Sequence, residues 1–282
     1  MNFRESKKDI FINNDIDKKD SDKISLVSHI TEIFWNDNWQ YGDYSKIHNS
    51  PVKLYHLNIA DKKNKIICVN AGHGTVGGEK VMTYCHPDKS PKYVSGSTTK
   101  GQVYAAAVSN GMIFQDGMPE AEVNLSLALI LKEELLKAGY DVLMIRESDD
   151  CQSDNIARTV FANNNADCHI ALHYDCSNMD KGLFYISVPD IEEYKNMEPV
   201  KSLWQIHNKL GEDLYFGAKI SGVKVYEKKD YPNDLTQTSY STIPTVVLEV
   251  GDRKSDYSYT AQKKIALGIS HGLDLFFETL ES

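Results

Sequence analysis

The chain has 282 residues, of which 41% are hydrophobic and 25% are charged, and its formal net charge at pH 7 is −9. This composition excludes a largely disordered chain, because it provides enough apolar residues for a sizeable core. The acidic balance argues against a nucleic acid as the partner, since binding one requires a surface that neutralises phosphates.

Three parts are expected along the chain. Residues 1–25 are rich in Lys, Asp, Asn and Ser, which predicts a polar, flexible tail. Residues 26–60 contain many aromatic side chains, and we expect them to pack as an N-terminal extension on the main domain. The main domain is predicted to occupy residues 61–282, as one unit without internal repeats.

The main domain alternates between strand patterns and helix patterns. The apolar run 66–69 predicts a buried strand that leads into a Gly-rich loop. Residues 120–138 place apolar side chains at helical spacing as far as Gly139, which predicts a helix. Further strands are predicted at residues 140–146, 167–174, 181–188 and 242–251, and further helices at 155–164, 199–217 and 259–280. This alternation predicts an α/β fold with an open, largely parallel central sheet and helices on both faces, in three layers.

The cysteines and the apolar segments bear on location and redox state. The five cysteines are odd in number and show no C-x-x-C spacing, which indicates neither a disulfide framework nor a cysteine zinc site. Cys68 and Cys168 lie in apolar runs and are expected to be buried as small hydrophobic residues. The sequence predicts no transmembrane segment, and its polar N-terminus lacks the apolar stretch of a signal peptide.

Four chemically useful side chains stand at the ends of predicted elements. His73 follows the first predicted strand, His173 lies near the end of the strand 167–174, and Glu249 lies near the end of the last strand, while Glu120 opens the long helix. Because ligand sites in open α/β sheets lie beyond the carboxyl ends of the strands, these groups are expected to meet there. Two histidines and a carboxylate suit a catalytic zinc, since three protein ligands leave the fourth position to water. The remaining glutamate could then act on that water.

Three of these residues also have a purely structural explanation. His73 could belong to a Gly-rich turn or a phosphate loop, although the segment lacks the G-K-[ST] ending of a P-loop. His173 could be a histidine at the edge of the core, held by one hydrogen bond. Glu120 could do no more than complement the dipole of its helix.

Glu249 requires a stronger explanation, because it follows the apolar run 246–248. A carboxylate in such surroundings is penalised by desolvation unless it has a partner or lies at a functional rim. An ion pair with Arg146 or Arg253 would be a structural partner of this kind. The residues alone leave both explanations open.

Six short blocks follow one another in order from about Lys65 to the C-terminus. They are A-G-H-G (71–74), E-x-x-x-N-L (120–125), R-x-x-D (146–149), R-x-x-x-A-N (158–163), A-D-x-x-I-A-L-H (166–173) and P-x-x-x-L-E-x-G (244–251). Together they resemble the blocks of the zinc-dependent N-acetylmuramoyl-L-alanine amidases of the type 3 family, in particular the clostridial type with an extended loop.

The resemblance implies a function and a role for each site residue. His73, Glu120 and His173 would bind Zn²⁺, and Glu249 would be the catalytic acid/base. The substrate would be peptidoglycan, cut at the amide bond between N-acetylmuramic acid and the L-alanine of the stem peptide, in the cell envelope or outside the cell. Zinc-activated water would attack the lactyl carbonyl, with Glu249 moving the proton to the departing nitrogen. Residues 61–282 would form the catalytic domain, with a zinc hydrolase-like fold.

This chain departs from the family pattern in places. The block that usually reads D-P-G-H-G is N-A-G-H-G here (70–74), and His173 is followed by Tyr174 and Asp175 instead of x-N. A long insertion at residues 75–118 is rich in Gly, Ser, Tyr and Lys, and could form a substrate wall or a lid.

Two other functions fit the same residues. A zinc carboxypeptidase or aminoacylase could use the same ligand set on free peptides, because such a site can polarise any amide. A catalytically silent wall-binding or regulatory module could keep the fold with the altered blocks. Product identity would separate the first alternative, and zinc content with turnover would separate the second.

Overall fold

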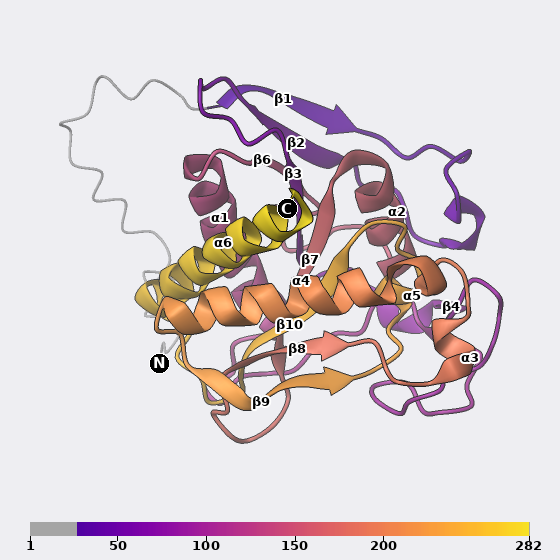
Figure 1. The fold of residues 1–282 in the computed structure, drawn as a ribbon. Helices are drawn as coiled ribbons and strands as arrows, with labels where there is room; N and C mark the ends of the chain where they lie inside the picture. The colour runs from indigo at the N-terminus through magenta and orange to yellow at the C-terminus, as the bar shows by residue number, and fades with distance from the viewer. Residues whose placement is uncertain (1–26, 282) are drawn as a thin grey trace, which may run out of the picture.

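The computed structural model describes residues 27–281, so the predicted tail at residues 1–25 lies outside the described part of the chain. An eight-stranded sheet with the order β1-β2-β6-β3-β7-β10-β8-β9 forms its centre (Figure 1). The strands are β1 Val27–Ile33, β2 Val52–Leu57, β3 Ile66–Ala71, β6 Asp141–Met144, β7 Cys168–Asp175, β8 Leu183–Ser187, β9 Val225–Pro232 and β10 Thr245–Asp252. A separate two-stranded sheet joins β4 (Met82–Tyr84) to β5 (Tyr104–Ala106).

Helices connect most of these strands. They are α1 Glu120–Lys137, α2 Asn155–Asn165, α3 Glu192–Lys195, α4 Val200–Ile220, α5 Thr236–Tyr240 and α6 Tyr259–Glu281, with short 3₁₀ turns at Gly42–Tyr44 and Gly78–Lys80. The predicted helix after Pro119 is confirmed. It ends where Gly139 takes up a positive φ of 93°, a conformation that other residues rarely adopt.

The middle of the sheet is parallel and its edges are mixed. Strands β6, β3, β7 and β10 run parallel to their neighbours in this group. Strands β2 and β8 pair antiparallel with β6 and β10, and β9 runs parallel to β8 at the far edge. The predicted α/β fold with a largely parallel sheet is therefore confirmed. The sequence pattern did not reveal the edge strands β1 and β9 or the strand β2 beside β1.

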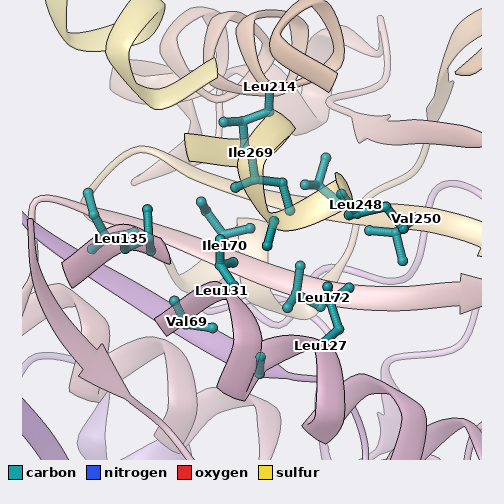
Figure 2. Packing of buried hydrophobic residues seen from close by; sticks show 14 of the residues in the cluster. Val69, Leu127, Leu131, Leu135, Ile170, Leu172, Leu214, Leu248, Val250 and Ile269 are labelled. Atoms are coloured by element: carbon teal, nitrogen blue, oxygen red, sulfur yellow. The ribbon is translucent and has the colours of Figure 1, made fainter. Parts of the chain in front are cut away.

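The two faces of the sheet are covered by different helices. Helices α1, α4 and α6 lie on one face, while α2 and α5 lie on the other (Figure 1). Figure 2 shows the larger core on the first face, with labelled side chains Val69, Leu127, Leu131, Leu135, Ile170, Leu172, Leu214, Leu248, Val250 and Ile269. Each of these leucine and isoleucine side chains stabilises the fold by roughly 1.5–3 kcal/mol when it is buried instead of exposed to water.

Because side chains alternate along a strand, the two histidines of β7 project to the second face of the sheet. In β7, Ile170 and Leu172 belong to the larger core, so His169 and His173 project from the opposite side. His169 there lies against Asn70, whose side chain in turn contacts Arg158 of α2. The carboxyl end of this face is the part of the sheet that carries the site.

Asp154, at the start of α2, binds the N-terminal segment at Lys46 and Ile47 to this helix on the second face of the sheet. It caps α2 through Oδ1, which accepts from the Ala157 N–H at 2.7 Å. Its Oδ2 accepts from the backbone N–H groups of Lys46 and Ile47 at 2.6 and 2.9 Å. Because Asp154 is fully buried, removing it would leave several donors without an acceptor in the interior.

The burial of two cysteines agrees with a further prediction. All five cysteines are free, and Cys68 and Cys168 are buried as predicted, with burial raising the pKa of the Cys68 thiol. Within residues 27–281, no helix combines the length and apolar character that a membrane span requires.

Candidate metal centre

Three of the predicted site residues meet at the carboxyl end of the parallel strands. His73 follows β3, Glu120 is the first residue of α1, and His173 lies near the end of β7. Glu120 Oε1 lies 3.0 Å from His73 Nε2 and 3.2 Å from His173 Nδ1, and the two ring nitrogens are 3.1 Å apart. Each residue directs one potential ligand atom to a common point, with all three atoms within 4.8 Å of one another.

The loop that carries His73 has a backbone that requires particular residues. His73 adopts a positive φ of 63°, which is uncommon for a residue with a side chain. At Gly72 a Cβ atom would lie 2.2 Å from the His173 ring, so any other residue would collide with it. Two buried arginines fix this loop, because Arg146 donates to the Gly72 carbonyl at 2.9 Å and Arg158 donates to the His73 carbonyl at 2.6 Å.

A backbone carbonyl selects the tautomer of His73. His73 Nδ1 lies 2.7 Å from the carbonyl oxygen of Ser109, which can only accept, so Nδ1 carries the hydrogen. In the neutral ring the lone pair then lies on Nε2, the nitrogen that faces Glu120 and His173 and that would bind a metal. Histidine ligands of metals are commonly oriented by a partner of this kind on the other ring nitrogen. Ser109 belongs to the insertion, so the insertion takes part in building the site.

Glu120 is held as an ionised carboxylate. Its Oε2 accepts from the Met112 N–H at 2.9 Å, and its Oε1 accepts from the Tyr174 N–H at 3.0 Å. Burial by itself would raise the pKa of Glu120, but the contacts with His173 and His73 outweigh it and hold that pKa well below the usual range. These contacts show that Glu120 does more than complement the helix dipole.

His173 does not behave as an isolated histidine of the core edge. Burial lowers the pKa of His173, the contact with Glu120 opposes this shift, and the charge of His73 adds to it. Its Nδ1 points to both Glu120 and His73. The structural explanation of one satisfying hydrogen bond therefore does not describe it.

Glu249 lies beside this group on the neighbouring strand. In the β7–β10 register it stands opposite His173, on the same face of the sheet. Its Oε2 is buried and has no hydrogen-bond partner in the described part of the chain. Burial raises the pKa of Glu249 well above that of an ordinary carboxyl group, and the charges of Glu120 and Asp175 add to this rise.

The proposed structural partners of Glu249 are engaged elsewhere. Arg146 donates to the carbonyl oxygens of Ala71, Ser148, Gly72 and Ala121. Arg253 donates to the Asn178 side chain. Among residues 27–281 neither arginine forms an ion pair with Glu249, so the explanation by an ion pair is wrong.

A cleft of about 840 Å³ opens over these residues. His73, Glu120, His173 and Glu249 line it together. The insertion supplies much of one wall, with Lys92, Gly96, Ser97, Thr98, Ala105, Ala106, Val108, Ser109, Asn110, Gly111 and Met112. Its size is that of a site for a ligand larger than a single amino acid.

A buried carboxylate holds the insertion against the sheet. Asp234, which is completely buried, lies 3.1 Å from His86 Nε2 and 3.0 Å from Lys92 Nζ. It also accepts from the backbone N–H groups of Tyr93 and Val94 at 2.6 and 3.0 Å. Burial opposes ionisation, but the hydrogen bond from His86 and the charge of Lys92 lower the pKa of Asp234 below its ordinary value. The insertion is thus a fixed wall in this structure.

We expect Asp234→Asn to loosen this wall and to destabilise the protein by roughly 3–5 kcal/mol, because it leaves the buried Lys92 ammonium without a counter-charge. Hydrogen exchange should accelerate first at residues 86–98, and thermal unfolding should occur at a lower temperature. The double variant Asp234→Asn with Lys92→Met removes the uncompensated charge and should regain most of the lost stability. Equal loss in the single and double variants would contradict this role of the ion pair.

The sequence patterns did not predict the roles of some residues around the site. Arg146 and Arg158 stood in two of the six blocks, and their spacing is the signal that marks them, but their contacts with the His73 loop are visible only in the fold. The carbonyl of Ser109 and the carboxylate of Asp234 carry no signal in the sequence, since the partners of Asp234 lie more than a hundred residues away.

Two histidines and a carboxylate at the strand ends of an α/β sheet, next to a second carboxylate, are typical of metal-dependent hydrolases. Comparison with protein families matches residues 67–275 to the N-acetylmuramoyl-L-alanine amidase model. The chain belongs to this family. A comparison with curated protein sequences found no match.

Solved structures of amidases share the fold. The N-acetylmuramyl-L-alanine amidase Ami1 from Mycobacterium smegmatis aligns over 77% of this chain and 98% of its own, with 16% identity and a TM-score of 0.59. Its counterpart from Mycobacterium abscessus aligns over 76% and 99%, with 17% identity and a TM-score of 0.57. The CwlD amidase from Clostridioides difficile, solved in complex with the GerS lipoprotein, aligns over 77% and 100%, with 19% identity and a TM-score of 0.54.

Proposed function

We propose that this chain hydrolyses the amide bond between N-acetylmuramic acid and the L-alanine of the stem peptide, with Zn²⁺ bound by His73, Glu120 and His173. The single observation that carries the mechanism is the convergence of these three ligand atoms beside Glu249 in one cleft. Membership of the amidase family supports peptidoglycan as the substrate. The place of action would be the cell envelope or the outside of the cell.

The donor set fits a zinc ion. Two imidazoles and one ionised carboxylate match the ligand types of catalytic zinc sites, which keep a further position open to water. His73 is fixed in the required tautomer by Ser109, and Glu120 is ionised. When bound, zinc supplies a Lewis acid that acidifies water and stabilises negative charge on the carbonyl oxygen.

The remaining chemistry falls to the side chains of the cleft. Glu249 would accept a proton from the attacking water and deliver it to the departing L-alanine nitrogen. Its position opposite His173 puts it next to the ligands without making it one of them. Burial raises the pKa of Glu249, which favours the protonated form that the delivery step requires once the carboxylate has taken the proton from water.

We expect the purified, zinc-loaded chain to release stem peptides with a free L-alanine amine from peptidoglycan, as identified by mass spectrometry. Unmodified N-acetylmuramic acid would remain on the glycan strands. Release of single amino acids from the end of the stem, or cleavage of acylated amino acids alone, would favour a carboxypeptidase or an aminoacylase. Absence of cleavage with zinc bound would favour the silent wall-binding module.

A further inference from the structure

Arg253 stands directly after β10 in the same cleft as His173 and Glu249. Its backbone N–H donates to the Ser177 carbonyl at 3.3 Å. The preceding residue, Asp252, is fully buried and accepts from the Lys181 N–H at 2.7 Å. These bonds connect the loop after β10 to the loop after β7, so the backbone of Arg253 is fixed relative to the metal centre.

The guanidinium group of Arg253 is only partly satisfied. Its Nη1 donates to Asn178 Oδ1 at 3.3 Å. Its Nε is buried and has no hydrogen-bond partner among the described residues. A buried donor without an acceptor destabilises the protein that carries it, and buried donors are satisfied in nearly all proteins. Because Nε is closed off from solvent, an acceptor brought by a ligand would reach the guanidinium group through its Nη atoms.

Charge distinguishes Arg253 from the other cationic side chains of the cleft. Lys92 is paired with Asp234, and Lys181 is paired with Asp175 and Asp252. Within residues 27–281 no carboxylate pairs with Arg253. The cleft therefore contains one fixed, uncompensated positive charge whose planar group presents neighbouring N–H donors, and a carboxylate is the acceptor that matches both properties.

We propose that Arg253 binds a free carboxylate of the stem peptide and thereby orients the scissile amide. This inference rests on the proposed function, because it takes the stem peptide as the substrate. A free carboxylate on the residue that follows L-alanine would be the stem carboxylate nearest the scissile amide. Arg253 is then a substrate-positioning residue that determines specificity for an unamidated stem.

Paired substrates test the contact directly. One muropeptide carries a free carboxylate on the second stem residue, and its partner carries a carboxamide there. We expect the unaltered chain to prefer the carboxylate by roughly ten- to a hundredfold in kcat/KM, as for a charge-assisted hydrogen bond in a cleft. Arg253→Gln should lose this factor on the carboxylate substrate alone, so that the variant no longer discriminates, and Arg253→Lys should restore part of the preference.

The neighbouring Lys254 provides the matched control. It is exposed and does not line the cleft, so Lys254→Gln removes the same charge without the proposed contact. This variant should keep the preference of the unaltered chain. Zinc content and thermal stability of both glutamine variants should remain unchanged. An equal loss on both substrates for Arg253→Gln, or no preference in the unaltered chain, would overturn the proposal.

A binding measurement separates failure of this inference from failure of the proposed function. Free stem peptides with L-alanine at the N-terminus, in carboxylate and carboxamide form, are titrated into the zinc-loaded chain by calorimetry. We expect roughly tenfold or more tighter binding of the carboxylate form, and loss of the difference in Arg253→Gln. If the chain cleaves no muropeptide, this difference still supports the carboxylate contact, and equal binding of both forms refutes it.

Discussion

Glu249→Gln is expected to lower kcat on peptidoglycan by roughly 10²- to 10⁴-fold, the usual contribution of a general acid/base, while bound zinc stays at the level of the unaltered chain. Glutamine has nearly the same shape but cannot accept and return a proton. Because Glu249 is not among the three converging ligand atoms, its replacement leaves the metal ligands intact. Chromatography of the released stem peptides measures kcat, and elemental analysis measures the bound zinc.

Stability distinguishes a catalytic carboxylate from a structural one at this position. A pKa raised in the folded state means that the folded chain favours the protonated form of Glu249, so its contribution to stability is lost as the pH rises through the raised pKa. At neutral pH the glutamine variant of the metal-free chain should therefore unfold at a temperature no lower than the unaltered chain. A structural ion pair would have the opposite signature.

Glu122 offers the matched control for this variant. It lies in the first turn of α1, is exposed, and is absent from the cleft lining. Glu122→Gln removes one acidic residue near the site without touching it, so turnover should stay within about twofold of the unaltered chain, as for surface substitutions generally. Near-normal turnover of the Glu249 variant with zinc bound would show that another group moves the proton.

The central elements of the fold were predictable because both faces of the parallel strands are buried. Apolar runs such as 66–69 and helices with one apolar face leave a clear pattern. The edge strands leave a weak one. β1 is mostly exposed, and β9 contains several charged residues and ends at Pro232, a residue that sheets tolerate at edges. Their pairing depends on neighbours already in place, which local sequence does not encode.

The candidate site was predictable as far as the strand-end rule reaches. That rule brought His73, His173 and Glu249 to one rim, and the start of α1 added Glu120. The surroundings of the site were not predictable, because they consist of backbone carbonyls and long-range pairs. The choice between an ion pair and a free carboxylate for Glu249 depended on where Arg146 points, and carbonyl oxygens of the His73 loop determine that direction.

Glu120→Gln is expected to abolish tight zinc binding and with it more than 99% of the activity, since it converts the ionised ligand into a neutral amide. The substitution keeps a carbonyl oxygen that can still accept from the Met112 or Tyr174 N–H, so the fold should be retained. Zinc affinity is measured by competition with a chelator of known strength, and the fold is checked by circular dichroism.

Asn124→Ala should have a smaller effect on zinc binding. Asn124 only donates to Glu120 Oε1 at 3.2 Å, and loss of such a supporting bond costs about 10- to 100-fold in metal affinity. If Glu120→Gln bound zinc as tightly as the unaltered chain, the third ligand would have to be another group, and Glu249, whose Oε2 is unpartnered in the described residues, would then be a ligand instead of the proton carrier.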